Sequence, residues 1–325
     1  MSGPNALPDG DRLAQALAAL RAEVEAAGLS VPGGPRAPRP VPLGAVGPAG
    51  GAGVAGPVLG GPVPLIAVAT TTGSEAEAMR QAVVASALGA DLVEVRADLI
   101  EPEPDSTAPS QGRAAAWASP ALATASLLAA EGRSTPVLLT VRTTAEGGAA
   151  DVDDAAYRRT LLETIRFLGE ARATGRFDLV RAVDVEIARG CLTEASTAAH
   201  EAGLAVVVSA HFFTSTPGQE EIVALLSRMQ QEGADAAKTA VMPRDGQAGH
   251  DDVLTLLRAT ARARAELEVP VITMSMGEQG VPTRLLGGVF GSALTFATAG
   301  AGASAPGQPE ITQVRQALAR LTWAR

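Results

Sequence analysis

One lysine lies alone in an apolar stretch, and its chemistry differs from that of every other basic residue in the chain. The sequence has 26 lysines and arginines together, and Lys238, in GADAAKTAVMPRDG, is its only lysine. Burial disfavours a charged amine and can lower the pKa of a lysine by up to about 3–5 pH units. A neutral amine forms Schiff bases with carbonyl groups, whereas a guanidinium stays charged. We therefore expect Lys238 to be an imine-forming nucleophile; a structural ammonium is the alternative.

An imine-forming lysine needs a group that moves protons beside it, and histidine has the pKa best suited to this. The chain has three histidines. His211 follows the most apolar run of the sequence, VVVSA, whereas His200 and His250 lie in polar segments typical of surface or capping residues. We therefore predict that His211 is the general acid and base.

Eight short apolar runs recur between residues 65 and 297, and most are separated by segments with helical spacing. Apolar strands that alternate with helices predict parallel βαβ units, and eight such units favour a (β/α)₈ TIM barrel over an open sheet. No glycine-rich nucleotide-binding motif follows the first strand. The predicted strands are residues 65–70, 91–96, 136–142, 182–187, 204–210, 236–242, 271–276 and 292–297.

Several of these apolar strands end in a charged residue. In a barrel of this class the carboxyl ends of the strands form one rim, which carries the reactive residues. Buried charges are costly unless they are paired, so one such residue alone could belong to a structural ion pair. Their recurrence on several strands favours a site at the rim, and the residues are Glu94, Arg96, Arg142, Asp184, Glu186, His211 and Lys238.

The composition excludes several classes of partner and location. A net charge of −9 without a basic cluster is unfavourable for binding nucleic acid or an anionic membrane. A single cysteine, Cys191, precludes an internal disulfide and suits a reducing compartment. No basic segment followed by an apolar core marks a secretory signal, and no run is apolar enough to span a membrane. We therefore expect a soluble, cytoplasmic protein.

The N-terminal part has a different character from the rest of the chain. Residues 11–28 have helical spacing, and residues 32–63 are dominated by proline and glycine, which is typical of a linker or a loosely paired hairpin. We therefore predict two parts, an N-terminal extension at residues 1–63 and a catalytic barrel at residues 64–325.

Seven stretches together resemble one known family, the type I 3-dehydroquinate dehydratases. Each motif is weak alone, but the seven occur in family order from about residue 64 onwards, which makes the resemblance specific. It implies a (β/α)₈ barrel, usually dimeric, that converts 3-dehydroquinate to 3-dehydroshikimate and water in the shikimate pathway without a metal or cofactor. The stretches are DLVEVRADLIE, LLTVRTTAEGG, VDVEI, VVVSAHFFTSTP, ADAAKTAVMP, VITMSMGEQGVPTRLLGGVFGSALTF and ASAPGQ.

The resemblance implies a role for each matched residue. Lys238 would form the imine with the substrate ketone, His211 would take the proton from the adjacent carbon and return it to the departing hydroxyl, and Glu146 would orient His211. Arg284 would bind the carboxylate, and Ser304 and Gln308 would belong to a lid over the substrate. The implied substrate-binding residues are Glu94, Arg96, Arg142, Arg284, Ser304 and Gln308.

Three positions depart from the family pattern. Phe212 follows His211 where the family usually has aspartate, Ala69 stands where a serine is usual, and Thr283 replaces a serine before Arg284. These changes motivate one alternative, a catalytically impaired paralogue that binds a shikimate-type ligand. A class I Schiff-base aldolase, which shares the barrel and the lysine, is the other.

Overall fold

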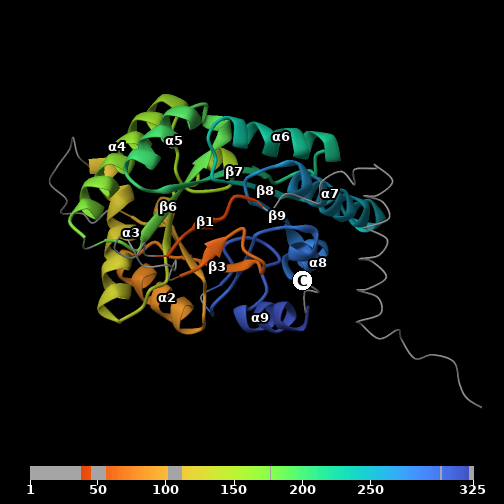
Figure 1. Cartoon of the computed structure of the whole chain (residues 1–325), viewed down its shortest axis with the longest axis horizontal. Helices are drawn as coiled ribbons and strands as arrows, with labels where there is room; N and C mark the ends of the chain where they lie inside the picture. Colours follow the sequence, from red (N-terminus) through yellow and green to blue (C-terminus); the bar gives the residue numbers. More distant parts are fainter. Residues whose placement is uncertain (1–37, 45–55, 102–111, 176, 301, 322–325) are drawn as a thin grey trace, which may run out of the picture. The chain divides into compact units, whose positions relative to one another are not determined.

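The computed structural model describes residues 38–44, 56–101, 112–175, 177–300 and 302–321 (Figure 1). Eight strands alternate with helices along this part of the chain, and the helices lie outside the strands. The barrel strands are β3 (Leu65–Ala69), β4 (Leu92–Arg96), β5 (Val137–Thr140), β6 (Val180–Glu186), β7 (Ala205–Phe212), β8 (Ala236–Val241), β9 (Val271–Ser275) and β10 (Leu294–Ala297). The helices are α2 (Glu75–Ala87), α3 (Gly112–Ala130), α4 (Asp154–Ala173), α5 (Leu192–Glu201), α6 (Gln219–Gln231), α7 (Gly246–Glu266), α8 (Gly277–Leu286) and α9 (Ile311–Arg320).

The eight strands are parallel and follow one another in the order β10-β3-β4-β5-β6-β7-β8-β9. The two ends of this sheet meet through a bridge between Val271 and Ser292, where the amide of Ala293 donates to the carbonyl of Val271 at 2.8 Å. The sheet is therefore nearly closed into a TIM barrel, which confirms the predicted fold class.

The strand sequences place alternate side chains inside and outside the barrel. On β7, Val206 and Val208 belong to the larger apolar core, called here the outer core, which includes residues of the surrounding helices. Val207 belongs to a second core, the inner core, which it forms with inward-facing residues of other strands. The same alternation directs Ser209 and His211 inward. Because both faces of each strand are buried, the strands are mostly apolar, and most of their polar residues lie in the middle or towards the carboxyl end.

A short antiparallel hairpin packs against the inner core of the barrel. Its strands are β1 (Val41–Pro42) and β2 (Val58–Leu59), with Val41 opposite Leu59. Leu43 and Leu59 are buried among inward-facing residues that include Leu65 and Leu92. These two strands lie within residues 32–63, the segment for which the sequence predicted a linker or a loosely paired hairpin. The predicted helix at residues 11–28 lies outside the described residues, and the domain boundary at residue 63 stays a prediction.

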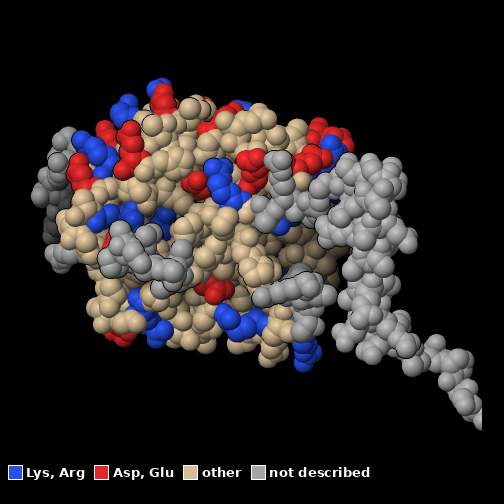
Figure 2. Space-filling view, in the orientation of Figure 1, with Lys and Arg blue, Asp and Glu red and all other residues tan. Residues whose placement is uncertain are grey.

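Charged side chains of both signs are interspersed on the face shown in Figure 2. Some pair across neighbouring helices: both oxygens of Glu194 accept from Arg158 at 2.6 Å. Exposed pairs of this kind contribute little to stability, so they indicate a solvated surface. Within the described ranges, no helix combines the length and apolar character needed to cross a membrane.

Candidate active site

A cavity of about 220 Å³ opens among the carboxyl ends of the strands and the loops that follow them. The nine residues to which the sequence analysis gave a catalytic or substrate-binding role all line this cavity, whereas Asp184 and Glu186, also expected at the rim, do not. Strands β4, β7 and β8 contribute some of them, and the loops after β5 and β10 contribute others. The nine residues are Glu94, Arg96, Arg142, Glu146, His211, Lys238, Arg284, Ser304 and Gln308.

Lys238 lies in the middle of β8 with its side chain inside the barrel and only 4% of the residue exposed. Its Nζ is 3.3 Å from Oδ2 of Asp184 and 3.4 Å from Oε1 of Glu94. The same nitrogen is 4.8 Å from the centre of the Phe296 ring. Two carboxylates and an aromatic face therefore surround an amine that also lines the cavity.

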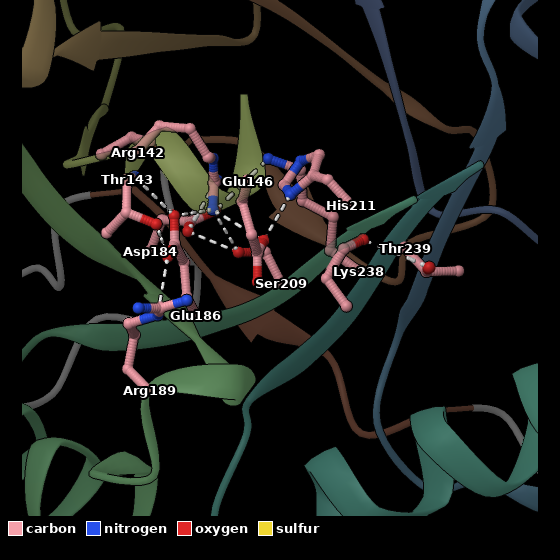
Figure 3. Close-up of polar contacts among 12 residues, drawn as sticks. Arg142, Thr143, Glu146, Asp184, Glu186, Arg189, Ser209, His211, Lys238 and Thr239 are labelled. Atoms are coloured by element: carbon pink, nitrogen blue, oxygen red, sulfur yellow. Dashed lines mark hydrogen bonds and ion pairs between the residues drawn. The ribbon is translucent and has the colours of Figure 1, made fainter. Parts of the chain in front are cut away.

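His211 and Glu146 form a hydrogen-bonded pair at the cavity wall, with Nδ1 of the imidazole 2.8 Å from Oε2 of the carboxyl group (Figure 3). Burial, followed by the nearby charges of Arg142 and Lys238, holds the pKa of His211 well below its usual value. Burial and the neighbouring Glu186 raise the pKa of Glu146 to about 8. A neutral imidazole beside a titrating carboxyl group is a suitable proton acceptor.

The glycines after Glu146 allow the loop to pack tightly. Gly147 has φ +77°, and a Cβ there would collide with the ring of Phe213, which stacks near His211 with ring centres 6.2 Å apart. A Cβ at Gly148 would collide with the carbonyl oxygen of Arg142. The sequence AEGG is thus required for the loop to place Glu146 against the histidine.

Arg142 joins three neighbouring strands beneath the cavity. Its Nη1 donates to Glu186 at 2.9 Å and to Ser209 at 2.8 Å, and its Nη2 donates to Asp184 at 2.8 Å (Figure 3). Burial opposes the charge of this guanidinium, but the carboxylates outweigh it and raise the pKa of Arg142 above its usual value. Arg142 lines the cavity, yet most of its hydrogen-bonding capacity is used within the protein.

Sequence reasoning assigned no role to several residues that organise the site. Asp184 and Glu186 were noted only as charged strand ends, and Ser209 was not singled out. Asp98 was also missed: it accepts two hydrogen bonds from Arg96, at 2.8 and 2.7 Å, and one from the amide of Ala149 at 3.1 Å. The R-x-D spacing was the available signal, because Asp98 anchors Arg96 to the loop that carries Glu146.

Arg284, on α8, also lines the cavity and is 2% exposed. Its Nη1 contacts Sδ of Met274 at 3.6 Å, its Nη2 donates to the carbonyl of Pro306 at 3.1 Å, and its Nε is buried without a partner among the described residues. Burial lowers the pKa of Arg284 to about 10, still far above neutrality. This cation has no carboxylate partner in the part of the chain described, so it can bind an anionic group.

The segment with Ser304 and Gln308 closes one side of the cavity. Oε1 of Gln308 accepts from the Ser304 amide at 2.9 Å, and Nε2 of Gln308 donates to the Ser304 hydroxyl at 2.9 Å. The carbonyl of Pro306 also accepts from the amide of Gly277 at 3.3 Å. The segment therefore rests on the start of α8 and on Arg284.

The structure locates the three departures from the family pattern. Phe212 packs against the outer core, so its side chain points away from the His211 imidazole. Thr283 keeps the hydroxyl, which accepts from the Ser275 amide at 2.9 Å and donates to the Gly280 carbonyl at 2.7 Å. Thr70 does not replace the hydroxyl missing at Ala69, because it does not line the cavity, and its own hydroxyl accepts from the Arg96 amide at 3.0 Å.

Comparisons with known proteins agree on one family. The family model described as Type I 3-dehydroquinase matches residues 66–322. The 3-dehydroquinate dehydratase of Geobacillus kaustophilus is 38% identical over 269 residues, which cover 82% of this chain and 95% of that protein. The 3-dehydroquinate dehydratase of Listeria welshimeri is 45% identical over 186 residues, 57% of this chain and 68% of that protein.

Solved structures give the same result. The crystal structure of the Geobacillus kaustophilus dehydratase superimposes with a TM-score of 0.69 at 35% identity, covering 82% of this chain and 95% of that one. The type I 3-dehydroquinate dehydratase of Clostridium difficile, solved with covalently modified comenic acid, has a TM-score of 0.67 at 31% identity, covering 81% and 94%.

Proposed function

The chain belongs to the type I 3-dehydroquinase family, hydro-lyases that dehydrate 3-dehydroquinate through a Schiff base in the shikimate pathway, and we propose which residues carry that reaction here. One observation supports the assignment most strongly. The amine of Lys238, the His211–Glu146 pair and the guanidinium of Arg284 all face one cavity. A nucleophile, a proton carrier and an anion-binding group are what this reaction requires of the protein.

In the proposed mechanism, the amine of Lys238 adds to the substrate ketone, and loss of water gives an iminium. His211 removes a proton from the carbon next to the iminium, and the electron pair moves to the nitrogen to form an enamine. The enamine then expels the hydroxyl group from the following carbon, and His211 returns its proton to that group to form water. Hydrolysis of the resulting iminium releases the product and restores the amine.

The other residues bind and orient the substrate. Arg284 holds its carboxylate, supported by the unpartnered Nε and the burial of the side chain. Glu94 and Arg96 contact its hydroxyl groups, and Ser304 and Gln308 cover it from the lid segment. Arg142 acts here mainly by fixing the carboxylates around Lys238, since its own donors are engaged.

Borohydride reduction tests the imine directly. The chain has one lysine, so a reduced adduct with 3-dehydroquinate must fall on Lys238 or on the terminal amine, which peptide mass analysis distinguishes. We expect the adduct on Lys238, formation of product at the enone absorbance band, and neither in Lys238→Ala. Lys238→Arg is the matched control, because it keeps a long basic side chain that cannot form an imine. Turnover by Lys238→Ala at nearly the normal rate would exclude this mechanism; trapping without turnover would indicate the impaired paralogue.

We also propose a homodimer. Four large apolar side chains are exposed on α7, on α8 and on the adjoining 3₁₀ helix η4 (Gly287–Phe290), which contact one another. Exposed apolar groups on neighbouring elements are typical of protein interfaces. The four residues are Leu254, Leu286, Val289 and Phe290. Sedimentation should give twice the chain mass, and Val289→Glu should reduce it; a monomeric parent protein would contradict the proposal.

Besides a second copy of the chain, the proposed partner is the small anionic substrate, in a cytoplasmic location, and we propose no role for nucleic acid. The net charge of −9 argues against a nucleic-acid partner, because it opposes binding to a polyanion. The single cysteine supports a cytoplasmic location, because Cys191 is buried and does not form a disulfide within the chain.

A further inference from the structure

Asp184 lies directly behind the reactive amine and does not line the cavity. Its Oδ2 is 3.3 Å from Nζ of Lys238. Its Oδ1 accepts from Nη2 of Arg142 at 2.8 Å and from Oγ of Ser209 at 2.6 Å (Figure 3). One oxygen is therefore held in place from two sides, which leaves the other directed at the lysine nitrogen.

Strand register produces this arrangement. Asp184 projects inward from β6, Ser209 from β7 and Lys238 from β8, and Ser209 and Lys238 are direct register partners. Because the three strands are neighbours in a nearly closed barrel, the contacts do not depend on a mobile loop. The carboxylate is thus positioned before any substrate arrives.

The charge of Asp184 is maintained despite its complete burial. Burial alone would raise the pKa of this carboxyl group, but Arg142, Lys238 and the Ser209 hydroxyl together lower it below its usual value. Asp184 is therefore ionised at neutral pH. It presents a fixed negative charge to the lysine nitrogen in surroundings that water scarcely reaches.

The other carboxylates near the amine are used differently. Glu94 lines the cavity and also accepts from Thr140 at 2.8 Å, so it faces the substrate as well as the lysine. Glu146 pairs with His211, and Glu186 accepts from Arg142 and Thr143. Of these four carboxylates, only Asp184 contacts Lys238 and neither lines the cavity nor contacts the His211 imidazole.

We propose that Asp184 is a positioning residue that serves as the fixed counter-charge of the Lys238 iminium. The inference rests on the proposed function, since it requires the imine. Formation of the iminium places a cation in a cavity that is also lined by Arg96, Arg142 and Arg284. A preorganised anion behind the nitrogen offsets this repulsion without any rearrangement, and so increases the fraction of bound substrate that is held as iminium.

Asp184→Asn tests the proposal, because the amide keeps the size of the side chain and removes its charge. We expect kcat to fall by about a hundredfold and KM to change little, since Asp184 does not line the cavity. The fraction of protein trapped by borohydride under saturating 3-dehydroquinate should fall with kcat. Asp184→Glu, which restores a carboxylate, should recover part of the trapped fraction.

Asp252→Asn is the control. Asp252 is also buried and also accepts from an arginine, Arg244, but it lies on α7 and has no contact with Lys238 or Arg142. This variant should yield the wild-type fraction of trapped iminium, which separates loss of a buried charge in general from loss of this one. A wild-type trapped fraction in folded Asp184→Asn, or an equal fall in both variants, would overturn the proposal.

A second variant applies if Asp184→Asn does not fold. Ser209→Ala removes the 2.6 Å hydrogen bond to Oδ1 and keeps the charge, so the trapped fraction should fall by a smaller factor, and no fall would overturn the inference. Failure of the proposed function looks different. In that case the unmodified protein itself would yield no adduct on Lys238.

Discussion

Replacing Glu146 with glutamine should remove the pH dependence of kcat/KM between pH 7 and pH 9. His211 is a base only when Nε2 carries a lone pair, which requires the proton on Nδ1. An ionised Glu146, 2.8 Å away, accepts a hydrogen bond from Nδ1–H and so fixes this tautomer. A protonated Glu146 can instead donate to Nδ1, which leaves the proton on Nε2 and makes the imidazole unable to accept one there.

The size of the effect follows from the position of the titration. Burial and Glu186 raise the pKa of Glu146 to about 8, from 4.5. The active carboxylate form is therefore lost as the pH falls through about 8: roughly a tenth remains at pH 7 and nine tenths is present at pH 9. We expect kcat/KM to rise about tenfold over this range. The pKa of His211 is held well below its usual value, so its own titration falls outside the window.

The free energy of unfolding should change with pH in the direction opposite to kcat/KM. Between pH 4.5 and about 8 the unfolded chain releases the Glu146 proton while the folded protein retains it, so stability falls as pH rises across this range. Glutamine resembles the protonated carboxyl group and avoids this penalty, which amounts to no more than about 5 kcal/mol. Glu146→Gln should therefore be less active than the wild type at pH 9, yet more resistant to urea.

Initial rates of enone formation, measured from pH 6 to pH 10 at constant ionic strength, provide the assay. Glu131→Gln, at an exposed position, should reproduce the wild-type profile. The reasoning is refuted if the wild type shows no rise between pH 7 and pH 9, or if Glu146→Gln retains the same rise.

Two further predictions concern binding and the hairpin. Arg284→Lys should raise KM about 10- to 100-fold with a smaller change in kcat, because lysine cannot form a bidentate pair with a carboxylate. Steady-state kinetics will measure both constants. An unchanged KM would argue against carboxylate binding by Arg284. Leu59→Ala should lower the free energy of unfolding by about 2–5 kcal/mol, because the leucine is buried against the inner core. Turnover at 25 °C should stay near normal, and urea titration should separate this outcome from a hairpin that contributes nothing to stability.

Much of the fold was predictable because the strand pattern is strong. Apolar runs such as residues 204–210 are typical of strands buried on both faces, and β7 occupies Ala205–Phe212. Their charged residues pointed to the rim, and the family resemblance added Glu146, Arg284, Ser304 and Gln308, which line the same cavity as Lys238 and His211. The hairpin was less predictable, since proline and glycine suit a linker as well as a turn, and the inward direction of Leu43 and Leu59 depends on the barrel they contact.

The contacts around Lys238 could not be predicted from the sequence. They depend on the register between β6, β7 and β8, which brings together side chains 54 residues apart in the case of Asp184 and Lys238. The direction of Phe212 was within reach, however. Neighbouring residues on a strand face opposite sides, so an inward His211 already implied an outward Phe212.

The guanidinium of Arg142 makes its neighbours interdependent. Because one side chain bonds to Asp184, Glu186 and Ser209 on two other strands, a change at any of these positions alters the charge balance for the rest. Substitutions here should show strong epistasis, with double variants that depart from the sum of their single effects. Redesign of this barrel interior would therefore need coordinated replacements chosen as a set.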